Sequence, residues 1–155
     1  MTGAAQVSIR LAELGEHAGK HLGYSAWHEV TQDQVNLFAD ATGDHQWIHV
    51  DEERAKAGPF GRPIAHGYLT LSLGPVLLWE VLHVEGASLV VNYGLGKARF
   101  PAPVPVGSRV RLGVELAAVD PLPEGAAQAT LAATFELEGS PKPCCVAEIL
   151  LRYYP

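Results

Sequence analysis

The chain has 155 residues, of which 48% are hydrophobic and 18% charged, and its formal net charge is -6. This length fits a single domain, residues 1–155, with a substantial buried core. The negative charge disfavours nucleic-acid binding, which requires a basic surface. No apolar run reaches the roughly 18 residues of a membrane-spanning helix, and the N-terminus lacks the pattern of a secretory signal. We therefore expect a cytoplasmic protein without a membrane segment.

The first part of the chain predicts short helices and loops. Residues 8–18 have the pattern of a short amphipathic helix, and residues 25–30 that of a strand. A further short helix is expected at 51–57. Residues 58–65 are rich in glycine and proline and predict a loop.

A helix is expected to begin after Thr31. Thr31 and Gln34 form a capping-box pattern, in which a threonine side chain accepts a hydrogen bond from the backbone three residues later. Apolar residues follow at helical spacing, and Gly43 is a typical helix terminator. The predicted helix therefore ends immediately before the segment GDHQWIHVD.

The segment 66–83, HGYLTLSLGPVLLWEVLH, predicts the main helix. Its apolar residues occur all round the helix, which predicts burial on every side. Gly74 and Pro75 lie inside it, and Pro75 lacks the amide hydrogen that would bond one turn back. We therefore expect a kink at this point.

The second half of the chain predicts four long strands, at 88–99, 107–119, 126–138 and 144–154. One long helix followed by antiparallel strands indicates an α+β fold in which a curved antiparallel sheet wraps around a long central helix. The two cysteines, Cys144 and Cys145, are adjacent, and their side chains would point to opposite faces of a strand. We expect no structural disulfide.

The segment GDHQWIHVD, residues 43–51, concentrates chemically active side chains. In a helix, Asp44 and His49 would lie about 140° apart, and in a strand they would face opposite sides. They can converge only if the chain forms an irregular turn after Gly43. The alternative is that Asp44 caps a turn and His49 packs in the core, and spacing alone leaves both open.

A resemblance favours the first alternative. The stretch FADATGDHQWIHVDEERAKAGPFGRPIAHGYLTLSL, residues 38–73, resembles the hydratase motif of the MaoC-like dehydratases, the (R)-specific enoyl-CoA hydratases of hot-dog fold. The following KARFPAPVPVGSRVR resembles the strand and turn after the central helix, and the likeness spans residues 20–154. The chain is most similar to the branch related to nodulation protein N. It departs from the commoner loop by having Gln46 and Trp47 in place of an Asn-Pro pair.

The resemblance implies a hydro-lyase, which reversibly adds water to a trans-2-enoyl thioester in the syn sense to give an (R)-3-hydroxyacyl product. Asp44 and His49 would hold one water and carry the protons. The backbone amide of Gly67, at the start of the central helix, would stabilise the enolate oxygen. Which of Asp44 and His49 deprotonates the water stays open.

The expected substrate is an acyl thioester of coenzyme A or of acyl-carrier protein. Coenzyme A is part of this substrate, and we expect no separate cofactor and no metal. The substrate-binding candidates are Trp47, Arg62, His66, Ser72 and Arg99. The family implies a homodimer whose sheets join edge to edge.

Three alternatives have different chemistry. A zinc site could use Asp44, His45, His49 and His66, although His45 would point away from His49 in most turn geometries. A hot-dog thioesterase would carry a carboxylate on the central helix, where Glu80 is the only acid and lies near the far end. A non-catalytic acyl-binding module would not need an acid and an imidazole together.

Overall fold

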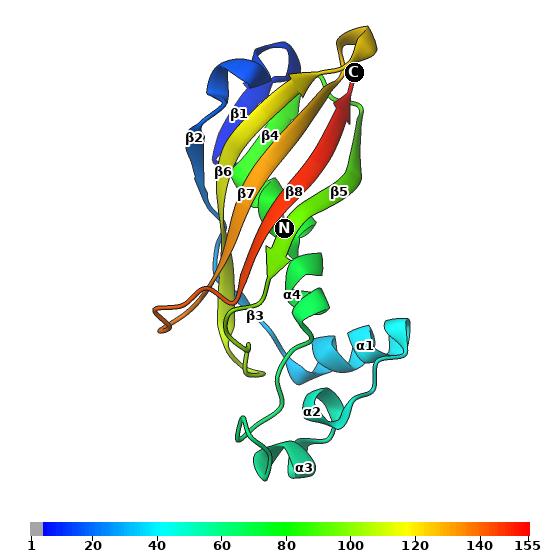
Figure 1. Ribbon diagram of the computed structural model, residues 1–155, viewed down its shortest axis with the longest axis vertical. Helices are drawn as coiled ribbons and strands as arrows, with labels where there is room; N and C mark the ends of the chain where they lie inside the picture. The colour runs from blue at the N-terminus through cyan, green and yellow to red at the C-terminus, as the bar shows by residue number, and fades with distance from the viewer. Residues whose placement is uncertain (1–4) are drawn as a thin grey trace.

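A curved antiparallel sheet forms the body of the protein (Figure 1). The computed structural model describes residues 5–155. The strands run in the order β2-β6-β7-β8-β5, and β3 pairs with β6 near the end of the sheet. Their bounds are β2 Lys20–Tyr24, β3 His28–Glu29, β5 Leu89–Arg99, β6 Arg109–Pro121, β7 Ala127–Leu137 and β8 Cys145–Tyr154.

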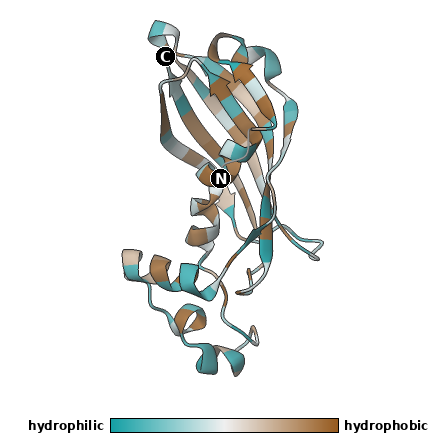
Figure 2. Cartoon of the chain, turned by 180° about the vertical axis from the view of Figure 1, so that it is seen from behind, coloured by the Kyte–Doolittle hydropathy of each residue, from teal (hydrophilic) through white to brown (hydrophobic). Residues whose placement is uncertain are grey.

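The sheet has one buried face, as the alternation of residues along its strands predicts. In β7 the buried residues alternate with half-buried ones along the whole strand. The same alternation of apolar and polar residues is visible from behind (Figure 2). Leu131 and Phe135 belong to the buried set, and Leu131 pairs with Leu116 of β6 on one side and Ile149 of β8 on the other. This face packs against the central helix.

The central helix consists of two segments, α4 (Gly67–Ser72) and α5 (Gly74–Val81). The predicted kink is confirmed, because the helix is interrupted at Leu73, directly before Gly74 and Pro75. A side chain at Gly74 would come within 3.5 Å of both Phe135 and Ile149. The helix therefore lies against the sheet at the break, at an ordinary van der Waals distance for a small side chain.

Three short helices lie below the N-terminal end of α4 (Figure 1). They are α1 (Gln32–Thr42), α2 (Trp47–Val50) and α3 (Glu52–Lys56). The predicted limits of α1 are confirmed: the Thr31 side chain accepts from the amide of Gln34 at 3.2 Å, and Gly43 has φ 82. Helix α3 matches the helix expected at 51–57, whereas the single turn α2 was not expected.

Two predictions near the N-terminus were wrong. Residues 7–10 form strand β1 (Val7–Arg10), which pairs in parallel with β4 (Leu82–Glu85), so only the 3₁₀ helix η1 (Leu11–His17) remains of the predicted helix. The strand expected at 25–30 is reduced to β3. The Ser25 hydroxyl accepts from the amide of Leu112 at 2.9 Å, where a backbone carbonyl would continue the sheet.

The central helix is not buried on every side, contrary to prediction. Tyr68 is 71% exposed, Trp79 is 58% exposed, and Val76 is also exposed in the single chain. The exposed apolar residues of β5 include Leu89, Val91 and Leu95. The central helix thus has more apolar surface than the sheet of a single chain covers.

The remaining features of the described chain are the connection between β6 and β7 and the two cysteines. A second 3₁₀ turn, η2 (Pro123–Gly125), joins β6 to β7. Cys144 and Cys145 are both free and buried, and burial raises the pKa of their thiols to about 12 and about 11. Among residues 5–155, no helix is both long enough and apolar enough to cross a membrane. The single-domain prediction includes residues 1–4, which lie outside the described residues.

Candidate active site

The turn between α1 and α2 presents Asp44. Gly43 ends α1 in the left-handed conformation, and the chain stays irregular until Trp47 begins α2. Asp44 is exposed, and its Oδ1 accepts from the amide of Gln46 at 3.3 Å. This is the irregular turn that spacing alone could not establish, followed by one helical turn that carries His49.

His49 is buried, with 6% of its surface exposed, and its ring orientation is fixed. Its Nδ1 donates to the carbonyl of Ile64 at 2.7 Å, because a carbonyl can only accept. The carbonyl of His49 itself accepts from the Gln32 side chain on α1 at 2.8 Å. The ring therefore keeps a lone pair on Nε2.

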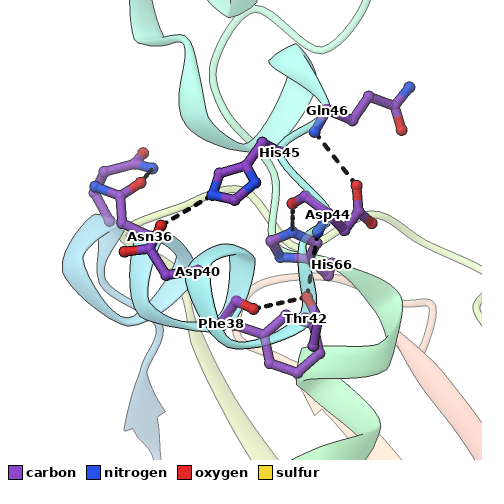
Figure 3. Close-up of polar contacts among 9 residues, drawn as sticks. Asn36, Phe38, Asp40, Thr42, Asp44, His45, Gln46 and His66 are labelled. Atoms are coloured by element: carbon purple, nitrogen blue, oxygen red, sulfur yellow. Dashed lines mark hydrogen bonds and ion pairs between the residues drawn. The ribbon is translucent and has the colours of Figure 1, made fainter.

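His66 lies against His49. The two rings stack with centroids 3.9 Å apart and an interplanar angle of 25°. The Nε2 of His66 donates to the backbone carbonyl of Asp44 at 2.9 Å (Figure 3). His66 was expected only to bind substrate, and neither contact was predicted, although its place next to Gly67 in the motif was a signal.

Side chains of Asp44, His49 and His66 come together although 22 residues separate the first from the last. Their potential ligand atoms all lie within 4.8 Å of one another. Among residues 5–155, they also form the one group whose composition could hold a metal ion. His45 does not join them, because its Nε2 pairs with Asp40 on α1 at 2.9 Å, which raises the pKa of His45.

The pKa of His49 lies below its ordinary value of 6.5, chiefly because burial disfavours the charged ring. The hydrogen bond to Ile64 and the carboxylate of Asp44 act in the opposite direction, while neighbouring His66 lowers the pKa further. His49 is therefore neutral near pH 7. A neutral imidazole with a free Nε2 can accept a proton.

Gly67 is the first residue of α4, and His66 occupies the N-cap position. The amide of a first helical residue has no partner within the helix, so it is available to another acceptor. A side chain at Gly67 would come within 3.0 Å of the Phe100 ring. Phe100 was not identified from the sequence, and it covers one side of the helix start.

The other substrate-binding candidates lie outside the cluster. The half-buried Trp47 packs against Gly58, and the Arg54 guanidinium lies 4.4 Å above its ring. Arg62 is exposed in the loop before α4. Arg99, at the end of β5, donates to the carbonyl of Ala98 at 2.8 Å.

An apolar cavity of about 280 Å³ lies along the central helix. It begins at Leu71 and Ser72, one turn beyond Gly67, and extends to Trp79 and the inner side of β5. The Ser72 hydroxyl donates to the carbonyl of Tyr68 at 2.6 Å. The other residues that line the cavity are Gly74, Pro75, Leu78, Val90, Asn92, Gly94, Leu95, Ile149 and Leu151.

This arrangement agrees with the comparisons to known proteins. A family model described as MaoC like domain matches residues 13–134. The chain belongs to the MaoC-like dehydratase family. This confirms the resemblance drawn from residues 38–73, and the MaoC-like solved structures confirm the α+β hot-dog fold.

Three relatives illustrate the match. The chain is 59% identical over 143 residues to 3-hydroxyacyl-thioester dehydratase Z of Mycobacterium tuberculosis, covering 92% of this chain and 95% of that protein. It is 47% identical over 105 residues to nodulation protein N of Rhizobium leguminosarum, and the match covers 66% of this chain and 65% of that protein. The solved (R)-hydratase from A. caviae, involved in PHA biosynthesis, superposes with a TM-score of 0.68 at 28% identity. The match covers 86% of this chain and 94% of that structure's chain.

The lowered pKa of His49 predicts a pH dependence of stability. Between the folded-state pKa and 6.5, the unfolded chain binds more protons than the folded one. The contribution of His49 is therefore fully present above pH 6.5 and is lost as the pH falls through this window. Urea unfolding at pH about 7.5 and about 5.5 should show that the free energy of unfolding falls less between the two pH values for His49→Gln than for the unsubstituted protein. Equal losses would contradict the burial argument.

Proposed function

We propose that this MaoC-like protein is a 3-hydroxyacyl-thioester dehydratase, working reversibly as an (R)-specific enoyl-thioester hydratase. The observation that carries the proposal is the convergence of Asp44 and His49 with His66, the residue that precedes the central helix. The names of its relatives, which are dehydratases and hydratases, support the same reaction class. Loss of absorbance of crotonyl-CoA at the enoyl-thioester band is the direct assay.

In the hydration direction, Asp44 and His49 hold one water molecule. The water oxygen forms a bond to C3 of the enoyl group as the pair accepts one of its protons, and the electrons of the C2–C3 double bond move towards the thioester. The pair then returns a proton to C2, so atoms and charge balance. One acid–base pair can serve both transfers because they occur on the same face of the substrate.

The amide of Gly67 would donate to the thioester oxygen as negative charge develops on it. A fixed donor at a half-buried helix start stabilises such an enolate more strongly than water does, because it needs no reorientation during the reaction. The adjoining cavity would hold the acyl chain, since its lining is mainly apolar and it begins four residues, about 6 Å of helix, beyond Gly67.

Coenzyme A or acyl-carrier protein would carry the acyl group. Arg62 and Arg99 are candidates to bind the phosphates, and we propose no separate cofactor. The thioesterase alternative is weaker, because Glu80 accepts from the amide of Ala26 at 2.9 Å at the far end of α5. Release of free coenzyme A from crotonyl-CoA would favour that alternative over hydration.

Removing either member of the pair should abolish most of the activity. Asp44→Asn and His49→Ala should each lower turnover by about 10² to 10⁴-fold, because each removes a proton-transfer group. The double variant should resemble the worse single variant, since both act on one water. The neighbouring exposed pair offers matched controls: Asp40→Asn and His45→Ala should keep their turnover. A loss of only a fewfold at Asp44 and His49 would refute the assignment.

Gly67→Ala should lower turnover by about 10² to 10³-fold and change the melting temperature little, because it displaces a donor needed mainly in the transition state. The added methyl group would also press on Phe100. Phe100→Leu in the Gly67→Ala background separates these causes by relieving the contact. If the double variant recovers full turnover, Gly67 serves packing alone.

We also propose a homodimer that buries the exposed apolar face. This face combines Tyr68, Val76 and Trp79 of the central helix with the edge strand β5. Val76→Glu, which lies on this face and does not line the cavity, should convert the dimer to a monomer at micromolar concentration, measured by light scattering after gel filtration. Leu37→Glu is the control, because Leu37 is 68% exposed on α1, away from this face. A fully active monomer of the unsubstituted protein would contradict the proposal.

A further inference from the structure

His66 is a buried ionisable residue to which the proposed mechanism assigns no proton transfer. Only 2% of its surface is exposed. The rings of His49 and Phe38 both contact it, with centroids 3.9 Å and 4.9 Å away. Burying a polar ring is unfavourable unless its hydrogen bonds are used, so its contacts need an explanation.

The hydrogen bonds fix the two histidines in opposite tautomers. Both partners are backbone carbonyls, which cannot donate. His66 therefore carries its proton on Nε2, bonded to Asp44, and His49 carries its proton on Nδ1, bonded to Ile64. Among residues 5–155, the Nδ1 of His66 has no partner. That lone pair of His66 is buried, whereas the unpaired Nε2 of His49 is not among the buried unpartnered atoms, so the lone pair of His49 is the better placed for proton transfer.

His66 also ties Asp44 to the central helix. The other hydrogen bonds of Asp44 are local: its amide donates to Thr42 at 3.4 Å and its Oδ1 accepts from the amide of Gln46. His66 reaches the same residue from the N-cap of α4. It contacts Asp44 by a hydrogen bond, His49 by stacking and Gly67 through the chain, so it connects all three members of the proposed site.

We propose that His66 is a positioning residue: its Nε2–H holds the carbonyl of Asp44 and its ring holds the face of His49. The distances between the Asp44 carboxylate, the His49 imidazole and the Gly67 amide then stay fixed. This inference rests on the proposed function, because the spacing matters only if the three groups act on one substrate. A displacement of about 1 Å in such a constellation can lower the rate by about 10²-fold.

Three substitutions separate the roles of the side chain. His66→Gln keeps a donor near the position of Nε2, His66→Phe keeps a flat ring against His49, and His66→Leu keeps neither. We expect kcat to fall on the order of 10 to 100-fold in His66→Leu with KM nearly unchanged. His66→Phe should remain impaired and His66→Gln should recover most of the turnover, because the hydrogen bond is what anchors the turn of Asp44.

Phe38→Leu is the matched control, because it changes the packing on the other side of the His66 ring without touching the hydrogen bond. Its kcat should stay close to that of the unsubstituted protein. Wild-type kcat in all three His66 variants, or a loss in His66→Gln as large as that in His66→Leu, would overturn the proposal. A loss that appears in KM instead of kcat would also overturn it, by assigning His66 to substrate binding.

Nitrogen NMR of the histidine rings tests the geometry without any turnover. The unsubstituted protein should show His66 protonated on Nε2 and His49 protonated on Nδ1, and the reverse assignment for His66 overturns the proposal even if a variant fails to fold. Absence of hydration by the folded, unsubstituted protein with crotonyl-CoA and longer enoyl thioesters would instead refute the proposed function. The two failures are therefore distinguishable.

Discussion

The extended segment at residues 63–66 is the constraint on which the site depends. On one side, Ala65 donates to Val104 at 2.8 Å and Val106 donates to Pro63 at 2.9 Å, which attaches the segment to the loop after β5. On the other side, Ile64 exchanges two hydrogen bonds with α2: its amide donates to Ile48, and its carbonyl accepts from the His49 ring. If this segment moved, the two hydrogen bonds between Ile64 and α2 would break, and so would the hydrogen bond from His66 to Asp44.

The scaffold around this segment gives the two residues of the pair different exposure to solvent. The sheet and the central helix supply a dry apolar support, and the buried alternation of β7 fixes which face receives the helix. The carboxylate of Asp44 is exposed, whereas His49 is buried. One partner therefore meets water and the other sits in a poorly solvated pocket. The two groups of the proposed pair therefore act from different surroundings.

The sequence predicted the long elements well because their signals are local. Thr31 and Gly43 limit α1 through their own backbone preferences, and Pro75 breaks the central helix by lacking an amide hydrogen. The short strand β1 was missed because it depends on pairing with a distant segment. The role of His66 was missed for the same reason, since its carbonyl partner lies 22 residues earlier in the chain. The family motif, not residue spacing, indicated that Asp44 and His49 belong to one site.

The break at Leu73 divides the central helix into two parts, and only the end of the first part shares the cavity with the second. Helix α4 begins beside His49 and His66, whereas α5 contributes Gly74, Pro75, Leu78 and Trp79 to the apolar cavity. Because the helix is already interrupted, a change of side-chain size in α5 need not be transmitted to the first turn of α4. Variants of this scaffold could therefore diverge in the length or branching of the chains they accept while their proton chemistry stays the same.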